Sequence, residues 1–141
     1  MSGKARAEQF SHGADIGVRG TGPTLEAAFE GAALALASAV TDLNAVNATS
    51  EIAIECEAPT PALLLFDWLN RLIYEMATRQ MVFGRFAVHI DGSRLRGHAW
   101  GEPVDRRRHA PAVEPKGATL TELKVEQRSD GTRIAQCVID V

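Results

Sequence analysis

Residues 132–139 constrain the fold more than any other segment, because they read as a strand that is apolar on both sides. The apolar side chains alternate between its faces, with Ile134 and Val138 on one and Ala135, Cys137 and Ile139 on the other. A strand of this kind is stable where both faces of its sheet are covered. We therefore expect it to run through the centre of a covered sheet.

Two other segments have the periodicity of helices. The first follows Thr24, a residue type that caps helix N-termini, and residues 25–40 are rich in alanine, which allows close packing on a sheet. The second begins at Thr60-Pro61, a cap followed by a proline in the first turn, and its apolar stripe includes Trp68. We predict two main helices at these positions.

Strands and turns account for most of the remaining chain. Glutamates alternate with apolar residues over 51–57, as in a strand with one face in water. Asp91-Gly92 and Asp130-Gly131 each separate two strand-like segments and predict hairpins. The order of elements predicts an α+β fold in a single domain, residues 1–141. We expect a two-layer sandwich in which a mixed or antiparallel sheet is packed by two main helices.

The composition limits the classes of function. The chain has 141 residues, of which 45% are hydrophobic, so it can build a core and does not resemble a disordered protein. Its net charge of −3 argues against binding nucleic acid through bulk positive charge. No apolar stretch approaches the ~20 residues of a membrane span. We expect a cytoplasmic protein with no membrane partner, in which Cys56 and Cys137 are reduced core residues.

Two acidic positions are candidates for metal binding. Asp140 adjoins the α-carboxylate of Val141, so either a cation or donors compensate these charges, or the end of the chain is frayed and solvated. Asp15 follows His12 closely and is either a second ligand or a turn residue that caps its own backbone. If Asp15 and Asp140 meet, their oxygen atoms favour Ca²⁺, Mg²⁺ or Mn²⁺.

A long loop is predicted over residues 101–117, which hold three prolines, four basic residues and no periodicity. Loops of this length in compact domains are usually functional or disordered. The three adjacent arginines at 106–108 either clamp phosphates or an acidic partner, or face solvent. The other polar residues of interest in the loop are Glu102, Asp105, His109 and Lys116.

Together these motifs resemble the archease family. The segment SHGADIGVRGTGPTLEAAFEGAALAL is similar to the opening motif and first helix of the family, and LLLFDWLNRLIYE is similar to its second helix. Later motifs are similar in the same order, around Glu102, Asp105 and His109, at Lys116-Gly-Ala-Thr and at the ending on Asp140. The resemblance spans nearly the whole chain.

The resemblance implies a function. Archeases are small α+β proteins that activate a GTP-dependent (RtcB-type) RNA ligase in tRNA splicing and RNA repair, promote its guanylylation and allow multiple turnover. By resemblance, the metal ligands are Asp15, Asp140 and Val141 with its carboxylate, and Lys116 assists the ligase in trans. The supporting positions are His12, His109, Glu102 and Asp105. On this basis the protein is not itself an enzyme, its cofactor is Ca²⁺ or Mg²⁺/Mn²⁺, and it contacts RNA only indirectly through the ligase.

Two departures and two alternatives accompany this resemblance. Gly13 stands where the family usually has threonine, and Leu120-Thr121 stands where Tyr-His is common. One alternative function is a chaperone-like modulator of other tRNA-modifying enzymes, such as methyltransferases. The other is a metal-dependent phosphoesterase, for which His12 is the candidate activating group.

Overall fold

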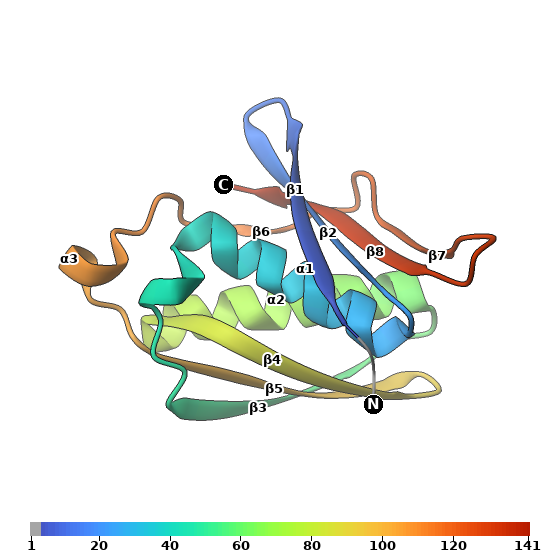
Figure 1. Ribbon diagram of the computed structural model, residues 1–141, viewed down its shortest axis with the longest axis horizontal. Helices are drawn as coiled ribbons and strands as arrows, with labels where there is room; N and C mark the ends of the chain where they lie inside the picture. The colour runs from blue at the N-terminus through green and yellow to red at the C-terminus, as the bar shows by residue number, and fades with distance from the viewer. Residues whose placement is uncertain (1–3) are drawn as a thin grey trace.

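The computed structural model describes residues 4–141 and arranges them as two antiparallel sheets with two long helices between them (Figure 1). Sheet A consists of β1 (Arg6–His12), β2 (Asp15–Gly22), β8 (Arg133–Asp140), β6 (Gly117–Ala118) and β7 (Lys124–Gln127). Sheet B consists of β3 (Ser50–Glu57), β5 (Arg94–Pro103) and β4 (Met81–Asp91). The helical elements are α1 (Leu25–Val40), η1 (Leu43–Ala45), α2 (Pro61–Arg79) and α3 (Arg106–His109).

The α+β class, the antiparallel pairing and the two main helices are confirmed. The strands, however, are divided between two sheets, so the helices have a sheet on each side and not one sheet on one side. The reason lies in α1, where ten of the sixteen residues are buried. A helix buried over so much of its circumference needs partners on both sides, whereas a single amphipathic stripe needs only one. No helix in the described part of the chain is long and apolar enough to cross a membrane.

Small residues allow α1 to lie unusually close to β2. A Cβ atom added at Gly20 would lie 1.9 Å from the carbonyl oxygen of Ala28 and 2.2 Å from the backbone nitrogen of Ala32. Gly31 faces the same contact, since a Cβ there would lie 2.9 Å from the Cα of Gly20. Glycine at these two positions therefore allows the close approach between this helix and sheet A.

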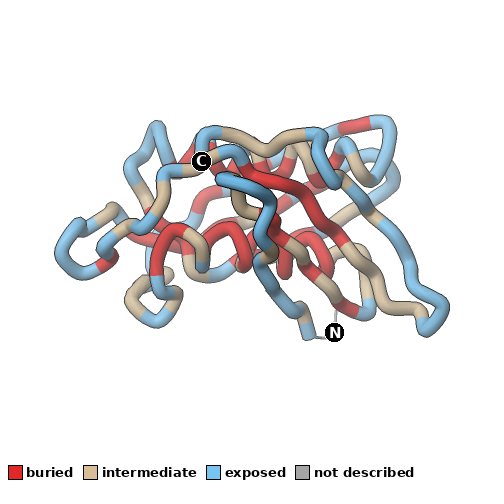
Figure 2. The backbone as a smooth tube through the Cα atoms, turned by 90° about the horizontal axis from the view of Figure 1, so that it is seen from above, coloured by how far each residue is buried: buried red, intermediate tan, exposed pale blue. Residues whose placement is uncertain are grey.

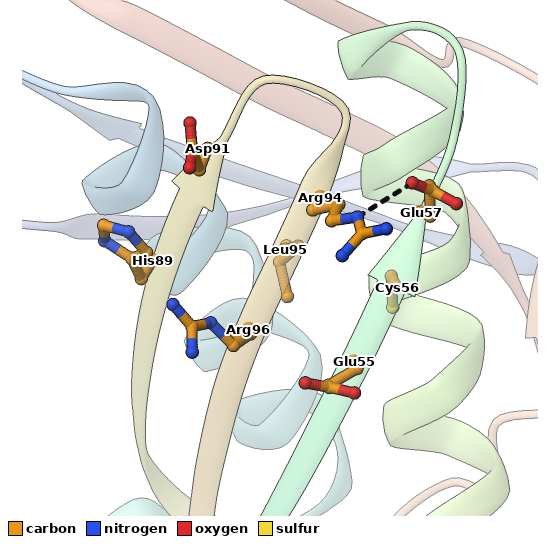
Figure 3. Close-up of a pocket in the computed structure, with 8 residues that line it drawn as sticks. All are labelled: Glu55, Cys56, Glu57, His89, Asp91, Arg94, Leu95 and Arg96. Atoms are coloured by element: carbon orange, nitrogen blue, oxygen red, sulfur yellow. Dashed lines mark hydrogen bonds and ion pairs between the residues drawn. The ribbon is translucent and has the colours of Figure 1, made fainter.

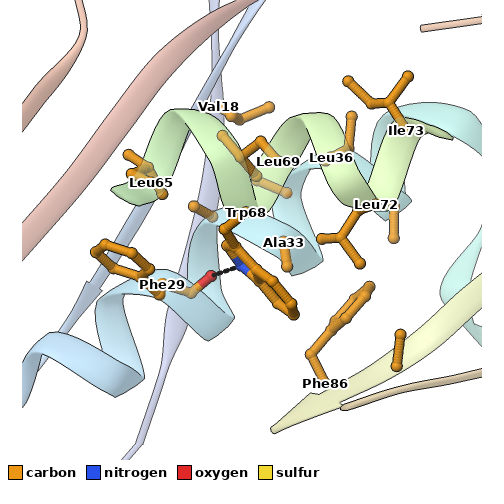
Figure 4. Packing of buried hydrophobic residues seen from close by; sticks show 14 of the residues in the cluster. Val18, Phe29, Ala33, Leu36, Leu65, Trp68, Leu69, Leu72, Ile73 and Phe86 are labelled. Atoms are coloured by element: carbon orange, nitrogen blue, oxygen red, sulfur yellow. Dashed lines mark hydrogen bonds between the residues drawn. The ribbon is translucent and has the colours of Figure 1, made fainter. Parts of the chain in front are cut away.

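The second helix supplies many of the large side chains of the core (Figure 4). Trp68 is fully buried, its indole N–H donates to the carbonyl of Phe29 at 3.2 Å, and its ring meets Phe86 edge to face. Thr60 accepts a hydrogen bond from the N–H of Leu63, as the predicted N-cap requires. The indole thus ties α2 to the backbone of α1 in the middle of the molecule.

Both predicted hairpins are present. β4 pairs with β5 across Asp91 and Gly92, and β7 pairs with β8 across Asp130 and Gly131. β8 also pairs with β2, which gives it the central position that its two apolar faces predict. In Figure 2 the buried backbone follows β8 and the helices, while exposed segments lie at the loops and along β1. The β1 strand itself was not expected, because nearly all of its residues are polar or exposed.

The predicted loop over residues 101–117 is only partly a loop. β5 continues to Pro103, and the arginine run forms the one-turn helix α3, which is capped by Asp105. The backbone then follows the end of α1, where the N–H of Ala112 donates to the carbonyl of Val40. We call residues 104–116 the strap. A single helical turn shows no periodicity, so the sequence pattern of the strap indicates only a loop.

Candidate functional site

The hydrogen-bond register of sheet A places several predicted site residues across one end of the sheet, and we call them the row. His12 pairs with Asp15 between β1 and β2, and Asp140 pairs with Gly117 between β8 and β6. The register that pairs Ile16 with Ile139 sets Asp15 opposite Asp140 at its next step. Side chains directly opposite each other in antiparallel strands point to the same face. His12 and Asp15 therefore share one face, and Asp140 lies at the same end of sheet A, one residue beyond the last β2–β8 pair.

A tight turn presents the first two of these side chains. His12 and Asp15 flank Gly13 and Ala14, and Gly13 has a φ of +61°. A β-branched residue is strongly disfavoured at positive φ. Glycine at this position, where the family usually has threonine, therefore suits the observed turn. Asp15 is half-buried, whereas His12 is exposed.

Val141 holds the end of the chain in place. Its side chain is half-buried and packs on the hydrophobic core, where it lines a small internal space together with Ile16, Ile139 and Pro115. The alternative of a frayed, solvated end is therefore wrong for this residue. The packing keeps the backbone of Val141 next to Asp140, at the end of the row.

Lys116 lies beside the same row. Its backbone N–H donates to the carbonyl oxygen of Asp140 at 2.8 Å, while its side chain is exposed. Among the residues that the structure describes, no salt bridge engages its ammonium group. The strap thus delivers a lysine to the acidic end of sheet A.

Apart from the exposed imidazole of His12, the donors at this end are oxygen atoms. Two side-chain carboxylates, Asp15 and Asp140, lie there, and the α-carboxylate predicted at Val141 would add a third. Within residues 4–141, no three His, Cys, Asp or Glu side chains are grouped closely enough to hold an ion by themselves. The residues fit a hard cation whose coordination is completed by the main-chain carboxylate, by water or by a partner. The site is open, and protein side chains do not enclose it.

The other predicted supporting residues form a separate cluster at α3, which Figure 1 shows apart from the C-terminus. Arg108 donates to both carboxylate oxygens of Glu102, at 2.7 and 2.9 Å. The backbone N–H of Asn47 and Nε2 of His109 also meet Glu102, at 2.7 and 3.0 Å. Bonding to the Arg108 guanidinium, followed by the Asn47 amide, holds the pKa of Glu102 well below its usual range.

His109 is the buried centre of this cluster, at 3% exposure. Its Nδ1 accepts the backbone N–H of Asp105 at 2.8 Å, so Nε2 carries the proton and donates to Glu102. The hydroxyl of Thr41 donates to the carbonyl oxygen of His109 at 2.5 Å. We call Glu102, Arg108 and His109 the clamp. It fastens α3 to β5 and to the end of α1, so Glu102, Asp105 and His109 hold the strap and do not contribute ligands to the row.

The sequence contains all members of the clamp but no pattern that pairs them. Glu102 pairs with Arg108 only because the chain reverses through α3, and the contacts with Asn47 and Thr41 join distant segments. The Asp105 cap before the arginine run is the one local signal of that reversal.

Comparison with known proteins agrees with the fold and with the motifs. A model of the archease protein family matches residues 8–141. An archease of Pyrococcus furiosus is 41% identical over 138 residues, covering 95% of this chain and 97% of the relative. The chain belongs to the archease family. This membership confirms the resemblance seen in the sequence.

Two solved structures share the archease fold. The solution structure of a Methanobacterium thermoautotrophicum protein is 32% identical, covers all of both chains and has a TM-score of 0.84. The crystal structure of an archease from Thermotoga maritima, described as a possible chaperone, has a TM-score of 0.59 and covers 95% of this chain and 96% of its own. At 18% identity the second comparison establishes similarity of fold alone.

Proposed function

We propose that this archease activates a GTP-dependent RNA ligase of the RtcB type, promoting its guanylylation and multiple turnover in tRNA splicing and RNA repair. The observation that carries the proposal is that Asp15, Asp140 and Lys116 lie at the same end of sheet A, with the backbone N–H of Lys116 bonded to the carbonyl oxygen of Asp140. The resemblance of the sequence motifs to the archease family, to which the chain belongs, implies the same role. The protein acts in this role as a partner of the ligase and not as a catalyst of its own.

The chemistry of the row suits such a partner. Asp15 and Asp140 place two negative charges at one end of sheet A, and the α-carboxylate predicted at Val141 would add another, so a divalent cation would relieve their repulsion. When bound, Ca²⁺ or Mg²⁺/Mn²⁺ would supply a fixed positive charge with open positions for oxygen atoms. Lys116 offers an exposed ammonium group beside this charge, suited to a phosphate or carboxylate of the ligase complex.

A ligation assay tests the proposal directly. With limiting ligase and excess broken RNA, we expect wild-type protein to raise the number of turnovers, and Asp15→Asn, Asp140→Asn and Lys116→Met to reduce the effect strongly. Glu126→Gln, which changes an exposed carboxylate on β7 of the same sheet, is the matched control. Indifference of turnover to wild-type protein, or equal effects of Asp140→Asn and Glu126→Gln, would refute the proposal.

Cation binding is measured separately. Titration calorimetry with Ca²⁺ and Mn²⁺ is expected to show one site that Asp140→Asn weakens. One added residue after Val141 moves the α-carboxylate and is expected to weaken the same site. Unchanged affinity in both variants would show that the row does not hold the cation.

A second candidate is a chaperone-like modulator of other tRNA-modifying enzymes, such as methyltransferases. It is favoured by the shared fold with the Thermotoga maritima archease that is described as a possible chaperone. This role needs a docking surface and not the carboxylates. Capture of a methyltransferase by wild type and by Asp140→Asn to the same extent would favour it over ligase activation.

A further inference from the structure

The two edges of sheet B are treated differently by the fold. On the β4 edge, helix α1 covers the outward backbone groups: a Glu30 carboxylate oxygen accepts the N–H of Val88 at 2.9 Å, and one of Glu26 accepts the N–H of Ile90 at 3.4 Å. Unpaired edge groups are a template for a further strand, and proteins commonly block them. The β4 edge is blocked in this way.

The β3 edge is open. The N–H of Ala58 donates to the carbonyl oxygen of Ser93, in the same register as the β3–β5 pair. Because hydrogen-bonded positions alternate along an antiparallel strand, the even-numbered residues of β3 are the ones that bond to β5. Odd-numbered residues then turn their N–H and C=O groups outward, namely Glu51, Ala53, Glu55 and Glu57. In the part of the chain that the structure describes, no hydrogen bond reaches these outward backbone groups.

The side chains along this edge are acidic. Glu51, Ala53, Glu55 and Glu57 are all exposed on the outer face of sheet B. Glu57 bonds to Arg94 at 3.0 Å and Glu51 to Nδ1 of His98, whereas Glu55 has no ion pair among the described residues (Figure 3). An added strand would set its own side chains directly opposite these glutamates, where basic residues are favoured and acidic ones repelled.

A groove runs beside the same edge. It has a volume of about 450 Å³ and lies between β3 and α2, lined by Glu55, Cys56, Glu57, Asp67, Asn70, Arg71 and Tyr74. The Tyr74 side chain is unusually exposed for an aromatic residue, at 59%. Alternate side chains of an added strand would turn into this groove, since successive residues of a strand face opposite sides.

We propose that the β3 edge binds an extended, basic segment of a partner protein by strand addition. The backbone of the segment pairs with the outward groups of residues 51–57. Its lysines or arginines face Glu51 and Glu55, and its intervening apolar residues lie against Cys56 and Tyr74. The site is in sheet B, whereas the carboxylate row is in sheet A, so the interaction does not depend on the cation or on Lys116.

Ala53→Pro is the decisive variant. Proline at residue 53 removes an outward donor and places its ring at the open edge, but it removes no bond to β5, as proline on an edge strand allows. We expect a short peptide that alternates lysine with valine to bind the wild type, as measured by fluorescence anisotropy. Its binding should slow amide exchange at Ala53 and Glu55. Ala53→Pro is expected to weaken binding at least about tenfold, while circular dichroism shows a folded protein.

Two further arms separate strand addition from attraction between charges. Glu55→Lys is expected to weaken the lysine peptide, and Glu126→Lys on β7 is the charge-matched control. The same peptide methylated on alternate backbone nitrogens keeps its charge but cannot form the backbone hydrogen bonds of a strand, so it should not bind. This comparison uses wild-type protein and does not depend on the folding of Ala53→Pro. Equal binding of the methylated peptide, equal effects of the two lysine variants, or no binding by the wild type would overturn the proposal.

Discussion

Replacement of Gly20 by alanine tests how closely α1 is packed on sheet A. The new Cβ atom would lie 1.9 Å from the carbonyl oxygen of Ala28 and 2.2 Å from the backbone nitrogen of Ala32. Both are backbone atoms of the helix, so no side-chain rotation relieves the overlap. The helix has to move away from β2, and its other side is already packed against sheet B.

The cost follows from this geometry. Extra methylene groups in packed cores typically cost 1–3 kcal/mol. Here the new Cβ atom overlaps two backbone atoms that cannot rotate away. We therefore expect a loss at the upper end of this range, about 3 kcal/mol in the free energy of unfolding. For a domain of this size, that corresponds to a fall in Tm of roughly 10 °C.

Urea unfolding, monitored by circular dichroism and by tryptophan fluorescence, measures this loss. Gly117→Ala is the control, because a Cβ at that position would meet only Asn70 Oδ1, at 3.4 Å. It is expected to change the free energy of unfolding by less than about 1 kcal/mol. If Gly20→Ala were as stable as Gly117→Ala, at unchanged m-value, the argument that backbone contact sets the helix position would fail.

Three further predictions concern stability. Trp68→Phe removes the indole hydrogen bond to Phe29 and part of the ring volume, and is expected to lower the free energy of unfolding by about 2 kcal/mol in urea titrations. Arg108 lowers the pKa of Glu102, so wild-type stability should fall as pH drops below about 4.5, and urea midpoints of Glu102→Gln should show less of this fall. Burial raises the pKa of Glu30, so its charge costs stability as pH rises above about 4.5. Glu30→Gln should remove this loss of stability. A Glu30→Gln variant that is less stable than wild type at pH 7 would contradict the prediction.

Much of the fold was predictable because its signals are local. Thr24 and Thr60 cap their helices through neighbouring backbone groups, and the glycines at 92 and 131 adopt the positive φ that their turns need. β8 is central because both of its faces are apolar. Each of these features depends on residues that are close in sequence, so one sequence suffices to find them.

The division into two sheets was not predictable in the same way. Strand patterns show which residues face a core, but not which strands pair. Sheet B, which contains β3, β4 and β5, lies opposite sheet A because the second side of α1 has to be covered as well. The short helix α3 escaped prediction because its stability comes from the clamp and not from periodicity.

The same distinction between local and long-range signals applies to the candidate site. The sequence by itself pointed to its members, because the motifs around Asp15, Lys116 and Asp140 resemble those of the archease family. Tertiary structure alone decided that Asp15 and Asp140 lie at the same end of sheet A, that Lys116 bonds to the backbone of Asp140, and that Glu102 and His109 lie elsewhere. The physical reason is that strand register and helix packing join distant segments, and a single sequence records the side chains but not their partners.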